Sequence, residues 1–577
     1  MEVVKAIAKQ ASAEHDRAAL RFDMKTHSYG QLISATWQML QELEAATTKS
    51  FQSEGVVGGK WSLGGARVGI LAKPSAEFVA GVLATWFGSG VVIPLAVNYP
   101  EAELFHVLND SEVSVLLSTE EHREIMEIVA SKCGAKYSQI PTVPSTPLAN
   151  GVHEVYGDVE ADILSAMFDL MKVSKTAEGN DPALIVYTSG TTSKPKGAVH
   201  THNSIAAQVK VLTEAWECSS TDQFLHCLPL HHIHPMLLTI IHMSFNVDFL
   251  PKFSVRGIWH KLRESYPKDG NAVIGGTITV FTGVPTMYTR LLQGYEAMDP
   301  ETQAASSYAA RQLRLMMCGS AALPYPLMKQ WESITGHWLL DRYGMTEFGV
   351  ALSNPLKGVR KAGTVGLPLP GVQLIWNEEA SCITNTDNEN LLSNYLKAKI
   401  IVDEDSDSSD GELAIKCASL FKEYWKQPKI TKEAFMDDGF FRTGDTVTMD
   451  EDGYYIISGR TNADIMKVGG YKLSALDIEA VLLEHPDVAE CSVLGLSDED
   501  YGQVVCAVIV PEASARERAK QESRPAMTLE ELQAWAKDKL APYKIPTKLF
   551  VFDAFKRNHM GKVNKKDLKK ELEQLEQ

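Results

Sequence analysis

The sequence predicts an α/β protein with a large N-terminal α/β domain of several subdomains and a small, mobile C-terminal α+β domain. Its 577 residues exceed what one hydrophobic core usually holds. Strand-like and helix-like segments alternate through the first half, and after Asp450 strands, a glycine-rich loop and a helix follow in quick order. We therefore expect an N-terminal domain over residues 1–459 and a C-terminal domain over residues 460–577. Charged, turn-forming residues around Arg460 are typical of a hinge.

The alternation is clearest in five consecutive segments of the N-terminal domain. Three of them are predicted to be strands, namely Arg67–Ala72, Gly90–Leu95 and Val113–Leu117. The two segments between them, Ser75–Phe87 and Glu101–Asn109, have helical patterns. Such alternation predicts a largely parallel sheet, whose loops are common ligand sites.

Two polar segments interrupt these patterns. Val402–Gly411 is acidic and rich in small residues, and Glu512–Pro525 is polar and charged. We expect both to be solvated surface loops.

Composition limits the classes of partner and the compartment. The net charge of −17 disfavours nucleic acid or an anionic membrane as a main partner. The eight cysteines show no CxxC spacing, which favours scattered reduced thiols over a zinc site. We find no transmembrane segment and no clear targeting signal. A cytoplasmic protein is therefore expected, with a mitochondrial location left open if a leader is missing.

One loop has the residues that a polyphosphate requires. The apolar run Leu184–Val186 leads into YTSGTTSKPKG, which ends at Gly197. Hydroxyls, flexible glycines and lysines can together bind phosphates, although the Walker A spacing is absent. By composition alone, such a stretch is more often a plain surface loop.

The complete string TSGTTSKPKG, followed by HTH, resembles the signature of the adenylate-forming superfamily, which includes the acyl-CoA synthetases. The resemblance implies that this loop holds the β- and γ-phosphates of ATP. The residues to which that role extends are Thr188, Ser189, Gly190, Thr191, Thr192 and Lys196.

Further segments resemble the family's nucleotide site, in the same order along the chain. CGSAALP, from Cys318, is similar to the adenine-contacting turn, which implies adenine contacts for Gly319, Ser320 and Ala321. DRYGMTE, from Asp341, is similar to the family's YGxTE core. The implied roles are packing on adenine for Tyr343, contact with the α-phosphate for Thr346, and Mg²⁺ binding for Glu347. A carboxylate is a hard ligand of the kind that Mg²⁺ prefers.

The ribose contacts and the hinge follow next. FRTGD ends at Asp445, whose carboxylate is implied to bind the ribose hydroxyls. SGR ends at Arg460, which in the family reaches the ribose or phosphate.

The C-terminal domain resembles the family's mobile domain. In RNHMGKVN, Lys562 stands in the place of the catalytic lysine, which would stabilise charge as pyrophosphate leaves. This chain has Lys556 where many relatives have proline. In KVGGYK, the resemblance places Lys467, Gly469 and Gly470 beside the pantetheine arm of coenzyme A. It implies acid adenylation first, then domain rotation and attack by the CoA thiol.

The acid-binding side is predicted from two segments. LPLHHIH resembles the family's substrate-side histidine motif, and we expect His232 and His234 to wall the acyl pocket rather than to bind a metal. In FTGVPTMYTRLL, Pro285 can open a helix with an apolar face that has Arg290 at its edge. A guanidinium suits the second carboxylate of a dicarboxylic acid. Arg290 is therefore the candidate clamp, although a surface arginine is the alternative.

Together with RYGMTEFG, LPKFSVRGIW and ADIMKVGGYKLSALDIE, this segment looks most like the malonyl-CoA synthetases, particularly the plant-type members. The resemblance implies an ATP- and Mg²⁺-dependent malonate:CoA ligase of fatty acid metabolism. Its products would be malonyl-CoA, AMP and pyrophosphate. The sequence departs from the family after His234, where PMLLT replaces a glycine-containing, slightly longer segment.

That departure keeps other functions open. Methylmalonate or another short- or medium-chain acid is the alternative substrate. A non-catalytic adenylate-binding relative is disfavoured by the intact Lys196, Glu347, Asp445 and Lys562. A carrier-loading adenylation domain is disfavoured because no carrier segment follows.

Overall fold

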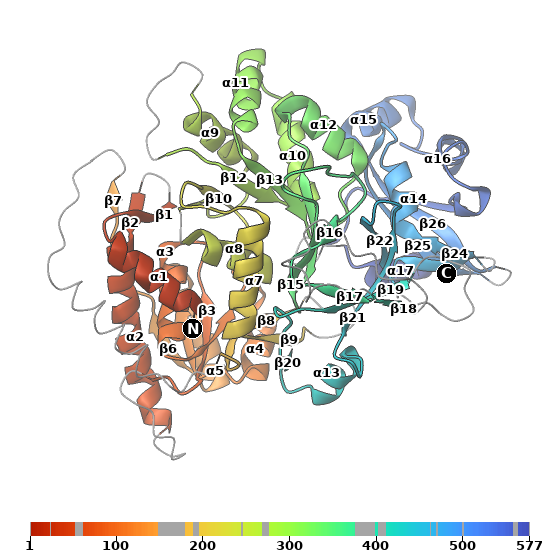
Figure 1. Cartoon of the computed structure of the whole chain (residues 1–577). Coiled ribbons are helices and arrows are strands. Elements are labelled where there is room, and N and C mark those ends of the chain that lie inside the picture. Colours follow the sequence, from red (N-terminus) through yellow and green to blue (C-terminus); the bar gives the residue numbers. More distant parts are fainter. Residues whose placement is uncertain are drawn as a thin grey trace, which may run out of the picture.

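A computed structural model gives an α/β fold with a large N-terminal domain and a small C-terminal domain, as the sequence predicts (Figure 1). The structure describes residues 2–22, 25–51, 62–147, 179–188, 195–243, 246–267, 276–375, 399–401, 411–461, 463–468, 471–498, 501–557 and 563–575. The C-terminal region lies on one side of the larger domain, at the right of Figure 1.

The first large sheet carries most of the strands that end at the candidate site. In spatial order its strands are β16 (Leu367–Pro368), β15 (Gly349–Ser353), β14 (Leu340–Met345), β13 (Leu315–Gly319), β12 (Val280–Gly283), β10 (Phe224–His226), β11 (Val247–Phe249), β1 (Ala18–Phe22), β2 (Lys25–Ser28) and β7 (Thr146–Pro147). The strands from β14 to β1 are parallel to their neighbours. Their carboxyl ends therefore meet at one edge, where ligands commonly bind in such sheets.

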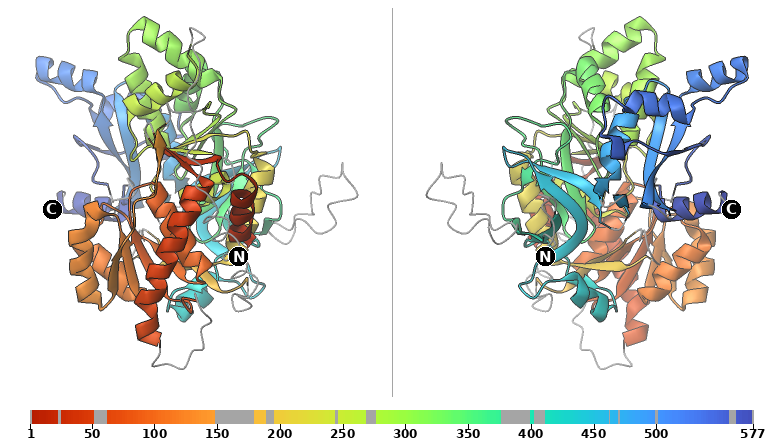
Figure 2. Two further views of the ribbon diagram at one scale, coloured as in Figure 1. Left: turned by 90° about the vertical axis from the view of Figure 1, so that its left-hand side faces the viewer. Right: turned by 90° about the vertical axis from the view of Figure 1, so that its right-hand side faces the viewer.

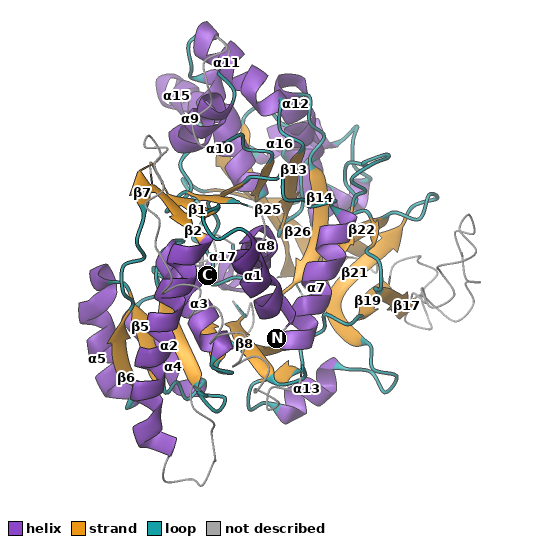
Figure 3. Cartoon of the chain, turned by 60° about the vertical axis from the view of Figure 1, so that its left-hand side comes forward, coloured by secondary structure: helices purple, strands orange, loops and turns teal. Residues whose placement is uncertain are grey.

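Helices cover both faces of this sheet, which explains its continuous apolar strands. In β13, Leu315 and Met317 enter one core, while Met316 and Cys318 enter the other. The first core is shared with α1 (Glu2–Ala13), α7 (His202–Ala215) and α8 (Ile233–Met243), which lie near the centre of Figure 3. The second core is formed with α9 (Val255–Ser265), α10 (Pro285–Glu296), α11 (Pro300–Arg311) and α12 (Tyr325–Thr335).

The second large sheet confirms the alternation that the sequence predicts. Its order is β20 (Glu423–Tyr424), β9 (Gly197–Thr201), β8 (Pro182–Tyr187), β4 (Val91–Pro94), β3 (Arg67–Leu71), β5 (Val115–Ser118) and β6 (Lys136–Gln139). One face packs on α2 (Tyr29–Phe51) and α3 (Ala76–Phe87), and the other on α4 (Glu101–Asp110) and α5 (Arg123–Cys133), which η1 (Glu120–His122) precedes. Figure 2 shows these helices and strands from two sides. Ser75 caps α3 by accepting the backbone N–H of Phe78 at 3.3 Å.

A third, antiparallel sheet completes the large domain. It consists of β17 (Gln373–Ile375), β18 (Lys399–Ile401), β19 (Gly411–Lys416), β21 (Phe441–Met449) and β22 (Tyr455–Arg460), with α13 (Pro428–Ala434) beside it. Leu413, Ile415 and Phe441 join the core of the first sheet. The strands that carry Tyr343 and Asp445 are thereby packed on one core.

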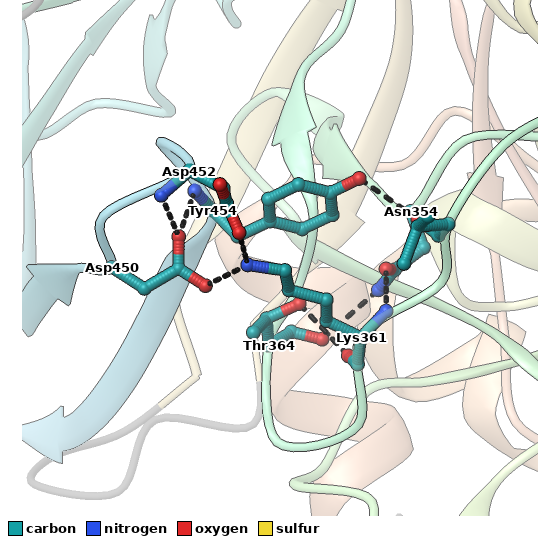
Figure 4. A network of polar contacts seen from close by, with 7 residues as sticks. Asn354, Lys361, Thr364, Asp450, Asp452 and Tyr454 are labelled. Carbon is teal, nitrogen blue, oxygen red and sulfur yellow. Dashed lines mark hydrogen bonds and ion pairs between the residues drawn. The ribbon is translucent and has the colours of Figure 1, made fainter.

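Lys361 ties the loop after β15 to the turn between β21 and β22 (Figure 4). Its ammonium group lies 2.8 Å from Asp450 and also pairs with Asp452. Its backbone N–H donates to Asn354 at 3.0 Å. The Tyr454 hydroxyl donates to the carbonyl of Val359 in the same loop at 2.8 Å. These contacts connect the first sheet to the third at their polar rim.

The C-terminal domain is built around a strand with two apolar faces. Val505, Ala507 and Ile509 of β26 enter one core, and Cys506, Val508 and Val510 enter the other. The elements in chain order are β23 (Ile465–Val468), β24 (Tyr471–Ser474), α14 (Ala475–Leu482), β25 (Val488–Asp498), β26 (Gly502–Pro511), α15 (Ala513–Glu522), α16 (Leu529–Ala536), η2 (Pro542–Lys544), β27 (Lys548–Val551) and α17 (Lys565–Leu575). β25, β26 and β27 form one sheet.

The prediction of a surface loop over Glu512–Pro525 is wrong, because the segment forms helix α15. Most residues of this helix are charged or polar. Only Ala515 and Ala519, one helical turn apart, are buried. Arg518 also pairs with Asp487 at 2.6 Å. The other predicted loop, Val402–Gly411, lies outside the described residues except for Gly411, which begins β19.

Over the described ranges, no helix has the length and apolar character of a membrane span. The cysteines within those ranges form no disulfide bonds.

Candidate active site

Tyr343 and Arg460 both contact Asp445. Asp445 on β21 lies opposite Arg460 on β22, and its Oδ1 is 2.9 Å from the Arg460 Nε. The Tyr343 hydroxyl, from β14, donates a hydrogen bond to the other carboxylate oxygen. A buried carboxylate thus lies between an aromatic ring and a guanidinium, which is suited to a ribose beside a flat base.

The charges of Asp445 and Arg460 offset each other's cost of burial. Burial raises the pKa of the Asp445 carboxyl, although Arg460 and the hydrogen bond from Tyr343 act in the opposite direction. Burial lowers the pKa of Arg460, but Asp445 and the other acidic neighbours outweigh it, so the net shift is upward. Arg460 also donates to the carbonyl of Thr443 at 2.8 Å. The guanidinium is therefore charged and held in place without a ligand.

The described ends of the predicted phosphate loop close on each other. The Thr188 N–H donates to the carbonyl of Lys196 at 2.8 Å, where β8 gives way to β9. The Lys196 ammonium lies 4.3 Å from the centre of the Tyr424 ring. Ser189, Gly190, Thr191 and Thr192 lie outside the described residues.

Tyr424 connects the phosphate loop to Glu347. Its hydroxyl donates to Glu347 Oε1 at 2.7 Å, and the Glu347 side chain is only 5% exposed. The backbone carbonyl of the preceding residue, Thr346, accepts from His200 Nε2 at 2.7 Å. Burial lowers the pKa of His200 to about 4, so this imidazole is neutral near pH 7. Lys196, Thr346 and Glu347 are thereby linked through Tyr424 and His200.

Glu347 fits the role of a magnesium ligand. A single buried carboxylate with one oxygen bound to a tyrosine leaves the other oxygen for a hard cation. Within the described ranges, no three His, Cys, Asp or Glu side chains gather as a metal cluster. One protein carboxylate fits Mg²⁺ whose remaining ligands are phosphate and water.

The predicted adenine turn follows β13 directly. Gly319 is buried, whereas Ser320 and Ala321 are exposed. A Cβ at Gly319 would lie 2.3 Å from Nη1 of Arg342 and 2.7 Å from its carbonyl oxygen, so only glycine fits. Ser320 has a φ of 68°, which turns the chain sharply away from the strand.

The acid-side candidates have different environments. His234 is 7% exposed, and its ring meets the edge of Trp216 at a centroid distance of 6.1 Å. His232 is half-buried and its ring lies 4.0 Å from that of His231. Arg290 is exposed on α10, whose buried face contains Met287 and Leu291 as the sequence predicts.

The unusual segment after His234 is the first part of helix α8. Pro235 lies in its first turn, where the missing N–H costs little. The Pro235 carbonyl accepts from the Thr239 hydroxyl at 2.9 Å and lies 3.3 Å from His226 Nε2. This local bonding fixes the start of the helix that presents His234.

The C-terminal candidates are described only in part. Lys467 is exposed on β23, and its backbone N–H donates to Gln503 at 2.8 Å. Gly469, Gly470 and Lys562 lie outside the described residues. Lys565, three residues after Lys562, lies 2.6 Å from Asp464 and 2.7 Å from Glu479. Asp464 also accepts the backbone N–H of Arg460 at 2.8 Å, which connects this group to the predicted hinge.

Our sequence interpretation missed Tyr424, His200 and Arg342. Tyr424 and His200 contact Glu347 and Thr346 from 77 and 146 positions away, so no local pattern indicates them. Arg342 lies within the DRYGMTE string itself, and its position beside Tyr343 was the available signal.

Comparisons with known proteins identify the family of this chain. Residues 7–425 match the AMP-binding enzyme family, and residues 477–562 match the C-terminal domain of AMP-binding enzymes. A malonate–CoA ligase of Arabidopsis thaliana is 56% identical, over 100% of this chain and 90% of that protein. A probable CoA ligase, CCL8 of Humulus lupulus, is 55% identical, over 99% of this chain and 92% of that protein.

Solved structures show the same fold. The ATP-bound MatB of Rhodopseudomonas palustris has a TM-score of 0.74 at 28% identity, over 100% of both chains. A malonyl-CoA ligase in a product complex with methylmalonyl-CoA and AMP has a TM-score of 0.58 at 30% identity, over 94% of this chain and 97% of that chain. From the family match and the full-length relatives, this chain belongs to the AMP-binding enzyme family and is an acid–thiol ligase that uses ATP and coenzyme A.

Proposed function

We propose that this chain is a malonate:CoA ligase, which converts malonate, ATP and coenzyme A to malonyl-CoA, AMP and pyrophosphate. The observation that carries this proposal is the 56% identity, over the whole chain, to a relative named for that activity. The geometry is consistent with it, because Tyr343, whose hydroxyl donates to Asp445, directly follows the buried Arg342 on β14.

The ribose and adenine would bind at the group formed by Tyr343, Asp445 and Arg460. Asp445 keeps lone pairs that can accept from both ribose hydroxyls, while Arg460 holds the carboxylate in orientation. Gly319, Ser320 and Ala321 would let the backbone approach the base.

The triphosphate would lie between the loop that starts at Thr188 and the strand end at Thr346. Lys196 and the hydroxyls and N–H groups of Ser189, Gly190, Thr191 and Thr192 would hold the β- and γ-phosphates. Glu347, oriented by Tyr424, would hold Mg²⁺, which neutralises phosphate charge when bound. Thr346 would contact the α-phosphate.

In the first half-reaction, a malonate carboxylate oxygen attacks the α-phosphorus, and the bond to the pyrophosphate oxygen breaks. Lys562 would stabilise the negative charge that develops there. In the second half-reaction, the CoA sulfur attacks the acyl carbonyl, and AMP leaves. Lys467, Gly469 and Gly470 would then face the pantetheine arm after the domain beginning at residue 460 rotates.

On the acid side, His232 and His234 would wall the pocket, and Arg290 is the sequence-based candidate for the second carboxylate. Arg290 has no ion pair within the described part of the chain and is exposed on α10. It is therefore available to an incoming anion.

Methylmalonate is the second candidate substrate. A structural relative is solved with methylmalonyl-CoA and AMP, and PMLLT follows His234 here. One added methyl group is discriminated weakly by an apolar wall, typically by about 10- to 200-fold. The two acids can therefore both be turned over.

The proposal is tested by pyrophosphate release with malonate, methylmalonate, acetate and octanoate, each with and without coenzyme A. We expect malonate to give the highest kcat/KM, and malonyl-CoA and AMP to appear in equal amounts only when CoA is present. A higher kcat/KM with acetate or octanoate would show that the malonate assignment is wrong.

We also propose a cytoplasmic location, although the related ACSF3 ligases of cattle and humans are named as mitochondrial. Microscopy of the full-length natural protein with a C-terminal fluorescent tag would test it, because overlap with a mitochondrial marker would contradict it.

A further inference from the structure

Lys565 begins helix α17 and places its charge inside the C-terminal domain. Its ammonium nitrogen is buried and lies 2.6 Å from Asp464 and 2.7 Å from Glu479, while the side chain is 15% exposed. The helix dipole disfavours a cation in the first turn of a helix. The place of this ammonium group is therefore set by its two carboxylate partners and not by the helix that carries it.

The ammonium group of Lys565 is charged although it is buried. Burial lowers the pKa of Lys565, but Glu479 and Asp464 together raise it by more, so the net shift is upward. Glu479 is itself held in place, because it accepts the backbone N–H of Val493 at 2.7 Å. Removing one partner of a buried ion pair is far more costly than removing one partner of an exposed pair. Lys565 therefore connects α17 firmly to the two carboxylates.

Asp464 continues this connection to the ribose-binding group. Its side chain accepts the backbone N–H of Arg460 at 2.8 Å, and the Arg460 side chain lies 2.9 Å from Asp445. It also lies close against Gly459, where an added Cβ would be 2.4 Å from the Cβ of Asp464. Gly459 has a φ of 124°, which glycine adopts far more readily than other residues. The chain before Arg460 therefore leaves room for this carboxylate.

The hydrogen bond between Arg460 and Asp464 crosses the predicted hinge. Arg460 is the last residue of β22 in the third sheet, and Asp464 directly precedes β23 of the C-terminal domain. A second hydrogen bond crosses at the same place, from the Ser474 hydroxyl to the Ser458 carbonyl at 2.6 Å. Rotation about the residues between Arg460 and Asp464 would change both distances. The two hydrogen bonds therefore belong to the domain orientation seen here.

The chain just before Lys565 is also anchored. Val563 forms a β-bridge with Arg557, and Arg557 pairs with Glu490 on β25. Lys562, the candidate catalytic lysine, directly precedes Val563 in the sequence. The backbone that follows Lys562 is therefore tied to β25, and through Lys565 to the hinge.

We propose that Lys565 is a positioning residue for the adenylation half-reaction. By pairing with Asp464, it sets the orientation of the C-terminal domain relative to the strand that carries Arg460, and thus the place from which Lys562 acts. This inference rests on the proposed ligase function and adds to it a residue that works through others. In the proposed reaction, thioester formation follows domain rotation, so it does not require the hydrogen bond between Arg460 and Asp464.

The test measures the two half-reactions separately in Lys565→Met, Lys565→Arg, Asp464→Asn and Glu479→Gln. Adenylation is followed by malonate-dependent exchange of labelled pyrophosphate into ATP, and thioester formation by mixing preformed malonyl-AMP with coenzyme A. Lys570→Met is the matched control, because Lys570 is an exposed lysine of the same helix. The ATP KM and the melting temperature of each variant are also recorded.

We expect Lys565→Met and Asp464→Asn each to lower kcat for adenylation on the order of 100-fold, since a small misplacement of a catalytic group can cost that much. Thioester formation and the ATP KM should stay close to the wild-type values. Lys565→Arg should restore most of the adenylation rate, because it returns the charge. Glu479→Gln should have a smaller effect, because it leaves Lys565 paired with Asp464. Lys570→Met should behave as the wild type.

Equal losses of both half-reactions in Lys565→Met and Asp464→Asn would show a merely structural role and overturn the inference. Full adenylation activity in either variant would overturn it as well. A selective loss in Glu479→Gln as large as that in Asp464→Asn would contradict the route through Asp464. If Lys565→Met does not fold, Asp464→Asn decides, because it keeps the size of the side chain.

The proposed function fails separately, if the wild type shows no malonate-dependent exchange. The same variants are then compared with the acid that does support exchange, so that the role of Lys565 is still decided.

Discussion

The nucleotide side and the acid side of the site differ in whether their buried polar groups are hydrogen-bonded to other protein groups. Around Asp445, the carboxylate, the Tyr343 hydroxyl and the Arg460 guanidinium bind one another. Around Arg342, the guanidinium Nε and both nitrogens of His234 have no partner in the described chain. Yet Arg342 and Tyr343 are consecutive residues of the same strand, β14.

The difference indicates how each side discriminates its ligand. On the nucleotide side, the protein has preassembled its contacts, so ATP binding replaces few internal bonds. On the acid side, the protein keeps donors that only an anion can satisfy, so the wrong acid is penalised. Single substitutions can show whether the two sides act separately.

The largest effect should come from Lys562→Ala, which alters neither side. Loss of its charge should slow adenylation on the order of 1,000-fold, since the charge acts as pyrophosphate leaves. Thioester formation from preformed malonyl-AMP should change little, and rapid-quench measurement of each half-reaction separates the two. Lys570→Ala, an exposed lysine on α17, is the control. Equal loss of both half-reactions would contradict the assigned role.

Asp445→Asn should disable the nucleotide side alone. It leaves Arg460 without its charge partner, and we expect kcat/KM for ATP to fall on the order of 100-fold. The KM for malonate, measured at saturating ATP, should stay near the wild-type value. A defect confined to malonate would mean that the two sides are not separable in this way.

Tyr424→Phe should produce a smaller change centred on Glu347. It removes the hydroxyl that orients this carboxylate, and we expect roughly a 10-fold loss that higher Mg²⁺ partly restores. Tyr454→Phe is a matched control, because its hydroxyl donates to the Val359 carbonyl at the sheet junction. Titration of activity against Mg²⁺ checks both variants, and an identical Mg²⁺ dependence would separate Tyr424 from the metal site.

The smallest effect concerns the stability of the acid side. Burial raises the pKa of Asp341 to about 7 from its ordinary 3.8, so the folded protein binds a proton there that the unfolded chain releases. Stability contributed at this position therefore falls as pH rises from about 4 through 7. Asp341→Asn removes this dependence. Its melting temperature relative to the wild type should rise by roughly 2–4 °C between about pH 5 and pH 8. A constant difference would exclude an ionising Asp341.

Much of the fold could be predicted because local patterns and burial agree. Both faces of strands such as β3 and β4 are buried, which gives short apolar runs between helical segments. Helix α15 was missed because its charged residues outnumber the two alanines that pack. Two alanines one turn apart are too weak a helical pattern to outweigh a composition that is typical of a solvated loop.

The site could be predicted only where consecutive residues carry it. The strings around Tyr343 and Asp445 name those residues, but not that Tyr343 donates to Asp445 across 102 positions. Arg290 was chosen because a guanidinium at the edge of an apolar helix face suits a second carboxylate and because its segment resembles the malonyl-CoA synthetases, and the structure leaves it exposed. Arg342 was overlooked because its surroundings come from β12, β13 and α8, which no local spacing brings together.

The contrast between the two sides is tested most directly by a crystal structure with malonate and a non-hydrolysable ATP analogue. We expect the second carboxylate to accept charge-assisted hydrogen bonds from an arginine guanidinium at about 2.7–2.9 Å. The ribose should meanwhile contact Asp445. A second carboxylate left in solvent without a cationic partner would contradict this account.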